Sequence, residues 1–410
     1  MFLVIVLRPP SYSYPAHNQP TQPCLGCSFR PGLKLSCYLA ISYKKAGIIL
    51  TLRSISVFQY KNYSNARFEF HERVIGICGP NGTGKTNLVD AIYNLCFTKS
   101  YFNRSDSQNV QHQKTGFRID GNFERLGQPM QVVSVLRETG KKEFSADGRL
   151  YDRLADHIGL LPAVIIAPDD AQLITGGSEE RRRYMDTLFS QLDQEYLRAL
   201  ILYNRVMQQR NAYLKSLEDR RLTDETLLNT YDSQLAAQGQ VVFLKRQEYL
   251  GELLPLALQF YQLIAGSMES VDVRYESMLL DSDTEMLLLR SREKDILAQR
   301  TTAGIHRDDL QLLLADRPFK PEASQGQRKS LLFALKLAEF DMLKKHKGFS
   351  PLLLLDDVFE KLDENRVRNL LSWVCKDNPG QIFITDTHPA RFIENINALG
   401  IKYQLVEVLD

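Results

Sequence analysis

The sequence predicts an α/β fold, in which helices flank a mixed, mainly parallel sheet and a helical second lobe is inserted into the chain. Three observations lead to this prediction. A buried-type strand, a glycine-rich loop and a helix follow one another between residues 73 and 97. Strands and helices alternate again from residue 325 onward, and the stretch between is rich in long, charged, leucine-rich helices. Such alternation is typical of parallel sheets, so both ends of the chain are expected to build one sheet.

Composition and pattern divide the chain into four segments. Residues 1–48 are rich in proline and have neither a helical nor a strand period, so we expect a disordered N-terminal extension. Residues 49–175 should form the first part of the main lobe and residues 176–300 the inserted helical lobe. Residues 301–410 should complete the main lobe.

In the first part of the main lobe, residues 50–70 alternate well enough to predict two strands around a turn. A short apolar strand at 73–78 should precede a helix at 87–97, which has apolar residues at helical spacing. Residues 117–170 contain the glycine and aspartate turns of a β-rich segment. In the insertion, Ser178 is the expected N-cap of a long helix, because two glutamates follow it.

The second part of the main lobe begins with a long amphipathic helix. Its apolar strands are short and each is followed by a helical pattern, which favours parallel pairing. The expected elements are a helix at 325–347, a strand at 351–357, a helix near 363–375, a strand at 381–387, a helix near 389–398 and a strand at 403–409.

The bulk composition excludes several classes of protein. Hydrophobic residues make up 44% of the 410 residues and charged residues 24%, which is ordinary for a soluble globular protein. The formal net charge is only +2, so any nucleic-acid site must be a local patch. No apolar run approaches the ~20 residues that span a bilayer. Six cysteines are too few for a disulfide scaffold, so we expect a cytoplasmic protein without membrane contact.

The glycine-rich loop has the sequence GPNGTGKT, which matches the phosphate-loop pattern G-x-x-x-x-G-K-[ST] completely. Its backbone N–H groups should converge on phosphate oxygens at the start of a helix, where the potential is positive. Lys85 should reach the β- and γ-phosphates, and Thr86 should give its hydroxyl to Mg²⁺. The predicted nucleotide-binding residues are Gly79, Pro80, Asn81, Gly82, Thr83, Gly84, Lys85 and Thr86.

Polar residues end two apolar strands of the second part. In PLLLLDD, Asp356 is expected to hold Mg²⁺ beside the phosphate loop, and Asp357 to polarise the attacking water as a general base. The alternative is a buried strand with a solvated acidic end, which a phosphate loop in the same chain makes less favoured. In ITDTH, His388 at the strand tip is expected to sense the γ-phosphate, although a lone histidine is often structural.

The helix predicted at 325–347 has a polar N-terminal segment. Ser324, Gln325 and Gly326 stand where a helix favours anions. Lys85 and Asp356 already account for one nucleotide. We therefore expect this second anion site to cover a nucleotide held by another subunit.

The order of these motifs resembles an ABC-type ATPase, whose signature segment acts across a dimer interface. The long insertion before Ser324 resembles the DNA-repair and chromosome-maintenance branch of that superfamily. Within this branch the chain is similar to the RecF family of bacterial recombination mediators. The segments that carry the resemblance are VFQYKNY (57–63), GPNGTGKTNLVDAIYNL (79–95), IIAPDD (165–170), GGSEERRRYMD (176–186), GIHRDDL (304–310), ASQGQRKSLLFALKLAEF (323–340) and LLLLDDVFEKLDENR (352–366).

The resemblance implies an ABC-type ATPase head with a helical second lobe, using ATP and Mg²⁺. It implies an ATP-dependent homodimer that binds DNA at single-strand/double-strand junctions in gaps. With RecR and RecO such a protein helps load RecA, supporting repair, replication restart and the SOS response. Hydrolysis is expected to be weak, stimulated by DNA, and to release the dimer from DNA.

The resemblance also implies roles by position. Ser324, Gln325 and Gly326 match the signature acting in trans, Asp363 matches the D-loop, and Gln113 is a candidate Mg²⁺-sensing glutamine. Asp357 stands where many ABC ATPases have glutamate, which is consistent with slow turnover.

DNA-binding and zinc-binding candidates are weaker. The run Arg181, Arg182 and Arg183 could contact DNA phosphates, or could form a solvated helix face with i,i+4 pairs. Lys61 could contact DNA from the head or serve a turn. One C-x-x-C pair, Cys24 and Cys27, with Cys37 and His17 nearby, is a weak zinc pattern.

Two other functions use the same phosphate loop. A transporter's ATPase subunit would have a more compact head than the long insertion allows. A P-loop kinase would need a substrate lid and no signature serine. Dimerisation that depends on ATP and DNA distinguishes a recombination mediator from a transporter's ATPase subunit and from a P-loop kinase.

Overall fold

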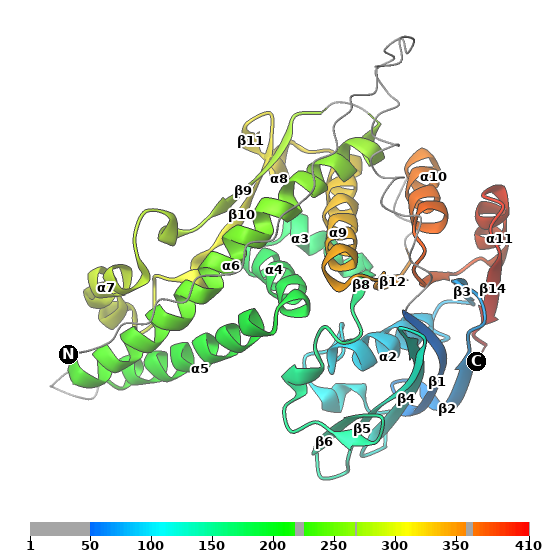
Figure 1. The fold of residues 1–410 in the computed structure, drawn as a ribbon, viewed down its shortest axis with the longest axis horizontal. Helices are drawn as coiled ribbons and strands as arrows, with labels where there is room; N and C mark the ends of the chain where they lie inside the picture. The colour runs from blue at the N-terminus through cyan, green and yellow to red at the C-terminus, as the bar shows by residue number, and fades with distance from the viewer. Residues whose placement is uncertain (1–49, 218–224, 267–268, 358–363, 410) are drawn as a thin grey trace, which may run out of the picture. The chain divides into compact units, whose positions relative to one another are not determined.

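The computed structural model describes residues 50–217, 225–266, 269–357 and 364–409 (Figure 1). The chain divides into two compact units, Met1–Ala46 and Gly47–Asp410, and the described residues all belong to the second. The predicted extension with Cys24, Cys27 and Cys37, and the D-loop residue Asp363, lie outside the described residues.

A five-stranded parallel sheet lies at the centre of this unit, with the strand order β14-β3-β13-β12-β8. Segments far apart in sequence are therefore neighbours, as predicted, and the α/β fold class is confirmed. Four of the strands are completely buried, which explains their continuous apolar runs. The strands are β3 (Val74–Cys78), β8 (Ala163–Ile166), β12 (Leu352–Leu355), β13 (Ile382–Asp386) and β14 (Tyr403–Glu407).

Alternate residues of this sheet belong to two different cores. In β12, Leu352 and Leu354 pack with α2 (Lys85–Phe97), whereas Leu353 and Leu355 pack with α9 (Gln325–Lys347). The two helices thus cover opposite faces of the sheet, because strand side chains alternate between faces. The predicted bounds of the helix at 325–347 are confirmed.

An antiparallel sheet with the order β2-β1-β4-β5-β6-β7 shares the core of α2 (Figure 1). It contains the two strands predicted at 50–70 and most of the β-rich segment. Its strands are β1 (Leu50–Tyr60), β2 (Tyr63–Glu69), β4 (Phe117–Arg125), β5 (Gln128–Leu136), β6 (Lys142–Ala146) and β7 (Arg149–Leu150). The short 3₁₀ helices near it are η1 (Asp106–Asn109), η2 (Leu154–His157) and η3 (Pro168–Asp170).

Residues 171–322, which extend beyond the predicted insertion of 176–300 at both ends, form long helices and a small antiparallel sheet, β11-β10-β9. The prediction that Ser178 caps the first helix is wrong: Gly177 occupies the N-cap with extended backbone, and Ser178 is already helical. The elements are α3 (Ala171–Thr175), α4 (Ser178–Leu192), α5 (Gln194–Ser216), α6 (Glu225–Ala265), β9 (Val271–Glu276), η4 (Met278–Leu280), α7 (Thr284–Ala298), η5 (Ile305–Arg307), β10 (Asp309–Leu314), β11 (Arg317–Pro318) and α8 (Phe319–Glu322). Towards the C-terminus follow α10 (Glu364–Ser372), a π-helical turn (Trp373–Asp377) and α11 (Pro389–Ala398).

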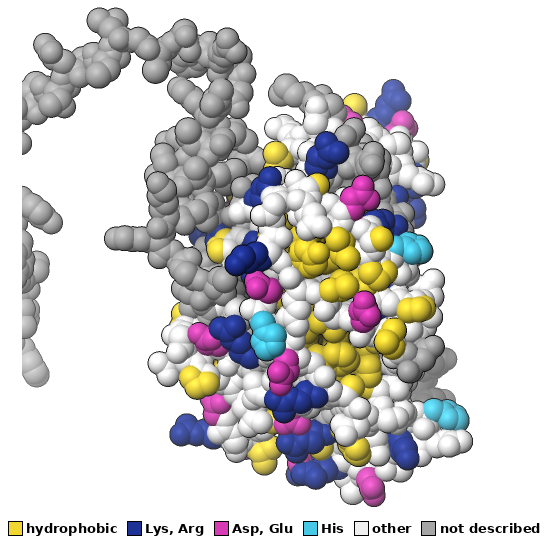
Figure 2. Space-filling model, turned by 90° about the vertical axis from the view of Figure 1, so that its right-hand side faces the viewer, with side chains coloured by type: hydrophobic (Ala, Val, Ile, Leu, Met, Phe, Trp, Pro, Cys, Tyr) yellow, Lys and Arg dark blue, Asp and Glu magenta, His cyan; other side chains and the backbone are white. Residues whose placement is uncertain are grey.

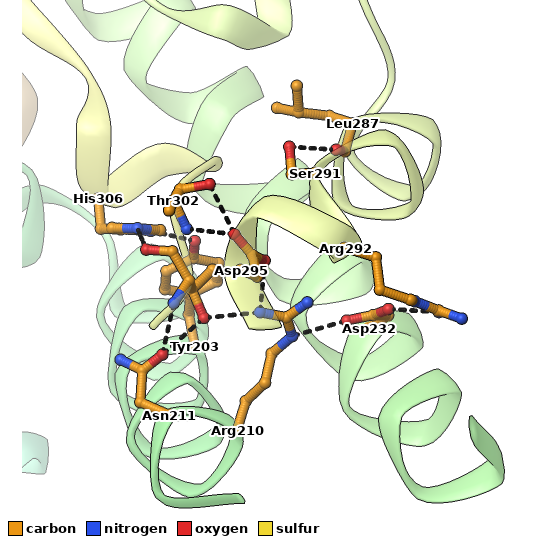
Figure 3. A network of polar contacts seen from close by, with 11 residues as sticks. Tyr203, Arg210, Asn211, Asp232, Leu287, Ser291, Arg292, Asp295, Thr302 and His306 are labelled. Carbon is orange, nitrogen blue, oxygen red and sulfur yellow. Dashed lines mark hydrogen bonds and ion pairs between the residues drawn. The ribbon is translucent and has the colours of Figure 1, made fainter. Parts of the chain in front are cut away.

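A buried ion network joins three helices of this lobe (Figure 3). Arg210 of α5 is fully buried and donates to Asp232 of α6 at 2.7 Å and to Asp295 of α7 at 2.6 Å. It also donates to the Thr301 hydroxyl at 3.0 Å. Because all three helices supply charged groups, including Arg292 of α7, which pairs with Asp232 at 2.6 Å, the network fixes how α5, α6 and α7 pack.

The buried His157 and the half-buried His306 make the stability of the protein depend on pH. His157 bonds the Leu95 carbonyl at 2.8 Å, and His306 lies between the Tyr203 hydroxyl at 2.8 Å and the Thr301 carbonyl at 3.1 Å (Figure 3). Burial lowers the pKa of each imidazole to about 4. In the unfolded chain each has a pKa near 6.5, so only the unfolded state gains protons between pH 6.5 and 4.

We therefore expect the free energy of unfolding to fall as pH drops from 6.5 to 4, by up to about 3 kcal/mol for each histidine. Thermal unfolding at pH 7.5, 6, 5 and 4.5 would measure this loss. His157→Gln should lose less stability over this range than wild type, and the exposed-site control His112→Gln should follow wild type. Equal pH dependence in all three proteins would contradict the prediction.

Candidate nucleotide-binding site

The loop between β3 and α2 has a backbone that glycine alone adopts without strain. Gly82 has φ of 90° and Gly84 has φ of 109°, both in the left-handed region. A Cβ on Gly84 would also lie 2.4 Å from the Asn62 side-chain nitrogen. The loop therefore keeps its open form, with its N–H groups at the start of α2, where anions bind favourably.

The turn between β1 and β2 holds this loop in place. Asn62 donates to the Thr83 carbonyl at 2.9 Å and accepts from Asn87 at 2.7 Å. Tyr63 donates its hydroxyl to the Gly84 carbonyl at 3.0 Å. Neither Asn62 nor Tyr63 was predicted as a site residue, because residues 50–70 predict only two strands and a turn. The sequence feature that could have pointed to Asn62 and Tyr63 is their position in the VFQYKNY segment.

Lys85 lies folded over the loop that precedes it. Its ammonium donates to the carbonyls of Gly79 at 2.9 Å and Pro80 at 2.8 Å, and the residue is 5% exposed. A buried cation bonded to neutral carbonyls favours a nearby anion. A nucleotide phosphate fits this requirement.

Thr86 and Asp356 are brought together from positions 270 residues apart. The Thr86 hydroxyl lies 3.1 and 3.0 Å from the two carboxylate oxygens of Asp356. Hydroxyl and carboxylate oxygens are the ligands that Mg²⁺ prefers, so the pair fits the predicted metal site. Burial raises the pKa of Asp356 to about 6, with a further increase from Asp357 and opposing hydrogen bonds from Thr385 and Thr86.

Asp357 has a backbone conformation that is unusual for a residue with a side chain. Its φ is 49°, in the left-handed region. Its N–H donates to the Thr385 hydroxyl at 2.9 Å, and the same hydroxyl donates to Asp356 at 2.8 Å. Thr385, which the sequence analysis did not single out, thus orients both acidic residues. Strained backbone of this kind is concentrated at functional sites.

The end of β13 lies beside the start of the phosphate loop. Gly79 donates its N–H to the Asp386 carbonyl at 3.3 Å, and the Asp386 side chain is paired with Arg391 at 2.5 Å. The backbone N–H of His388 donates to Asp386 at 3.0 Å, and His388 itself is exposed. The strand therefore brings His388 to the same edge of the sheet as the loop, as predicted for neighbouring parallel strands.

The predicted signature segment lies at the start of α9. Ser324 caps this helix, accepting from the Gln327 N–H at 3.2 Å, while Gln327 accepts from the Ser324 N–H at 2.8 Å. Ser324 and Gln325 are exposed, and Gly326 is half-buried. Within the described residues, no hydrogen bond joins Ser324, Gln325 or Gly326 to the phosphate loop of the same chain. The segment is free to face another molecule.

The structure does not support a DNA contact by Lys61. Its ammonium forms an ion pair with the buried carboxylate of Asp90 at 2.6 Å, and its side chain is only 11% exposed. It also lies over the ring of Phe102.

Gln113 is exposed with φ of 63°, whereas Gln111 bonds the Asn62 carbonyl at 3.3 Å. The Mg²⁺-sensing role therefore stays a prediction for Gln113. Gln111 is the glutamine that is bonded to the turn between β1 and β2.

The three consecutive arginines of α4 have intramolecular partners. Arg181 pairs with Asp309 at 2.6 Å, Arg182 donates to the Asp308 carbonyl at 2.7 Å, and Arg183 pairs with Glu180 at 3.1 Å. The first two attach α4 to the start of β10. Arg183 is the exposed member of the three. On the face shown in Figure 2, basic and acidic side chains are intermingled, in keeping with the low net charge.

In the part of the chain that the structure describes, no helix combines the length and apolar character needed to cross a membrane.

Comparison with known proteins gives consistent matches over most of the chain. The family model for the RecF/RecN/SMC N-terminal domain matches residues 51–405. The DNA replication and repair protein RecF of Flavobacterium johnsoniae is 45% identical over 340 residues, covering 83% of this chain and 95% of that protein. The RecF protein of Bacteroides fragilis is 42% identical over 360 residues, covering 88% and 96%.

Solved structures agree with the sequence matches. The recombination mediator protein RecF-ATPrS of the RecFOR pathway superposes with a TM-score of 0.78 and 28% identity, covering 84% of this chain and 94% of that chain. The corresponding RecF-ATP structure gives a TM-score of 0.77 at 28% identity, covering 85% and 95%. An Smc head domain from Pyrococcus furiosus, at 13% identity and a TM-score of 0.52, shares the fold.

Proposed function

Since the chain belongs to the RecF family of DNA replication and repair proteins, we propose that it binds and hydrolyses ATP as a switch for DNA binding. The observation that carries this proposal is the contact of Thr86 with both oxygens of Asp356. This contact places the buried carboxylate of Asp356 beside the phosphate loop, which also carries the buried Lys85. A nucleoside triphosphate with Mg²⁺ is the ligand that these groups fit together.

Each of these residues has a separate role in the proposed hydrolysis. Residues 79–86 hold the phosphates through backbone N–H groups, and Lys85 can leave its two carbonyl partners for the β- and γ-phosphates. Thr86 and Asp356 would hold Mg²⁺, which neutralises charge on the phosphates. Asp357 orients and deprotonates the attacking water, with its backbone fixed by Thr385. His388 senses the γ-phosphate from the tip of β13.

The second half of the site is proposed to come from another subunit. Ser324, Gln325 and Gly326 lie at an exposed helix start, where anions bind favourably. In a homodimer each signature segment would contact the γ-phosphate held by its partner. ATP would then join the two subunits, and hydrolysis would release them.

Family membership supports a proposal for the DNA substrate and the protein partners. Solved relatives are recombination mediators of the RecFOR pathway. We propose that the ATP-bound dimer binds single-strand/double-strand junctions at gaps. There it would act with RecR, and through RecO would help to load RecA for repair, replication restart and the SOS response.

Ser324→Ala tests the shared site. It should weaken the ATP-dependent dimer about 100-fold, since each of two equivalent sites loses a hydrogen bond to a charged group. ATP affinity of the monomer should stay unchanged. Analytical ultracentrifugation with Mg-ATP, with and without gapped duplex DNA, measures this, and Ser105→Ala on the exposed surface is the control. A normal ATP-dependent dimer from Ser324→Ala would refute the trans arrangement.

A further inference from the structure

A cavity of about 480 Å³ lies away from the nucleotide site. Its walls come from the C-terminal half of α2 and the loop after it, from β8 and η3, and from α4 and α9. None of residues 79–86, Asp356, Asp357 or Ser324 lines it. Cavities of this size are typical of sites that take a small ligand or a side chain.

The floor of the cavity has more acceptors than donors. Lys336 lies 3.4 Å from Asp170 and 3.7 Å from Glu339, and the three side chains are 3–8% exposed. Asp170 has further donors, the Tyr101 hydroxyl and the Ala167 N–H. Glu339 Oε2 is buried, and its nearest donor, the Lys336 ammonium, forms an ion pair with it at 3.7 Å, which is longer than a normal hydrogen bond.

The walls are aromatic and the rim carries both charges. Tyr93 and Phe97 stack at 4.2 Å, and Tyr101 contacts Tyr93 edge to face. The other aromatic and charged residues that line the cavity are Phe102, Tyr184, Lys99, Arg104, Asp169, Glu179, Glu180 and Arg183. Arg183 is already paired with Glu180. Aromatic faces together with a carboxylate that lacks a donor at hydrogen-bond distance favour a cationic ligand.

We propose that this cavity binds a lysine or arginine side chain of a partner protein, which donates to Glu339 Oε2. The floor excludes an acidic group, because two carboxylates face one lysine there. A basic side chain supplies a closer donor and places its alkyl part against the aromatic walls. The site is independent of ATP binding and gives the head a surface for a partner other than a second copy of this chain.

The raised pKa of Glu339 is consistent with a carboxylate that has room for a second cation beside it. The pKa of this carboxyl is raised to about 7, mainly by burial; Lys336 of α9 lowers it, and Asp170 of η3 contributes to the rise. The other ionisable groups that face it are the hydroxyls of Tyr93, Tyr101 and Tyr184. A bound cation favours the ionised carboxylate, so binding should be tighter at pH 8 than at pH 6.

The test uses the full chain with Mg-ATP and two peptides, acetyl-Gly-Arg-Gly-amide and acetyl-Gly-Glu-Gly-amide. Methyl NMR of Ile165 and Leu173, which line the cavity, reports binding. The arginine peptide should shift both signals saturably, and the glutamate peptide should not. Glu339→Gln should weaken binding at least tenfold, whereas Glu252→Gln, which lies in a surface pair with Lys345, should bind as wild type.

A second variant covers the case in which Glu339→Gln does not fold. Thr187→Phe puts a ring into the cavity without touching its floor, and should abolish the shifts while ATP affinity is retained. Unshifted cavity signals in wild type, equal binding by the Glu339→Gln or Thr187→Phe protein, or preference for the glutamate peptide would each overturn the proposal.

Discussion

Asp357→Asn is expected to slow ATP hydrolysis by about 10²- to 10⁴-fold while the ATP-bound dimer persists. Asparagine cannot accept the proton of the attacking water. It does tolerate the left-handed backbone that Asp357 adopts, and it retains the N–H bond to Thr385. ATP binding and signature contacts should therefore survive, so the dimer accumulates.

Single-turnover phosphate release and ultracentrifugation with Mg-ATP measure the two effects separately. The matched control is Asp316→Asn, because Asp316 also has positive φ, at 59°, and lies on the surface at 81% side-chain exposure. It should hydrolyse ATP like wild type. A normal hydrolysis rate in Asp357→Asn would show that Asp357 is not the general base.

Arg210→Met is expected to lower the free energy of unfolding by about 3–5 kcal/mol. The substitution leaves the carboxylate of Asp295 completely buried and that of Asp232 nearly so, without their shared cation. The cost comes mostly from the carboxylate of Asp295, because Asp232 keeps its ion pair with Arg292 at 2.6 Å. Urea denaturation followed by circular dichroism measures it.

Arg274→Met is the control, because Arg274 pairs with Asp272 and Asp316 on the surface with half of its side chain exposed. Its effect should stay below about 1 kcal/mol. A double variant, Arg210→Met with Asp295→Asn, should recover part of the loss. Similar stability of the Arg210→Met and Arg274→Met proteins would mean that the network contributes little.

The sequence predicted the features that depend on local pattern. The phosphate loop, the parallel sheet and the helix at 325–347 follow from glycine spacing, apolar runs and helical periodicity, and the structure has the sheet and the helix as predicted. The approach of Asp356 to Thr86 followed from the rule that parallel strands present their carboxyl ends at one edge.

Features that depend on distant partners could not be predicted in this way. Asn62 holds the phosphate loop only because a turn places it there, and no pattern connects it to Thr83. Arg181 and Arg182 resembled a solvated basic run, but their partners lie more than 120 residues away in sequence. Arg210 belongs to a long, charged helix, and its burial depends on the packing of three helices.

The position of β3 between β14 and β13 also bears on the synthesis of the protein. β3, which leads into the phosphate loop, pairs with β13 and β14 and so has both neighbours in residues 382–407. During translation the motif for nucleotide binding is made early, but its strand has no partners until almost the whole chain has left the ribosome. A nascent or prematurely terminated chain therefore exposes an apolar strand and lacks a competent phosphate loop. Chains that lack residues 382–407 are therefore expected to bind nucleotide poorly and to be substrates for chaperones and proteases.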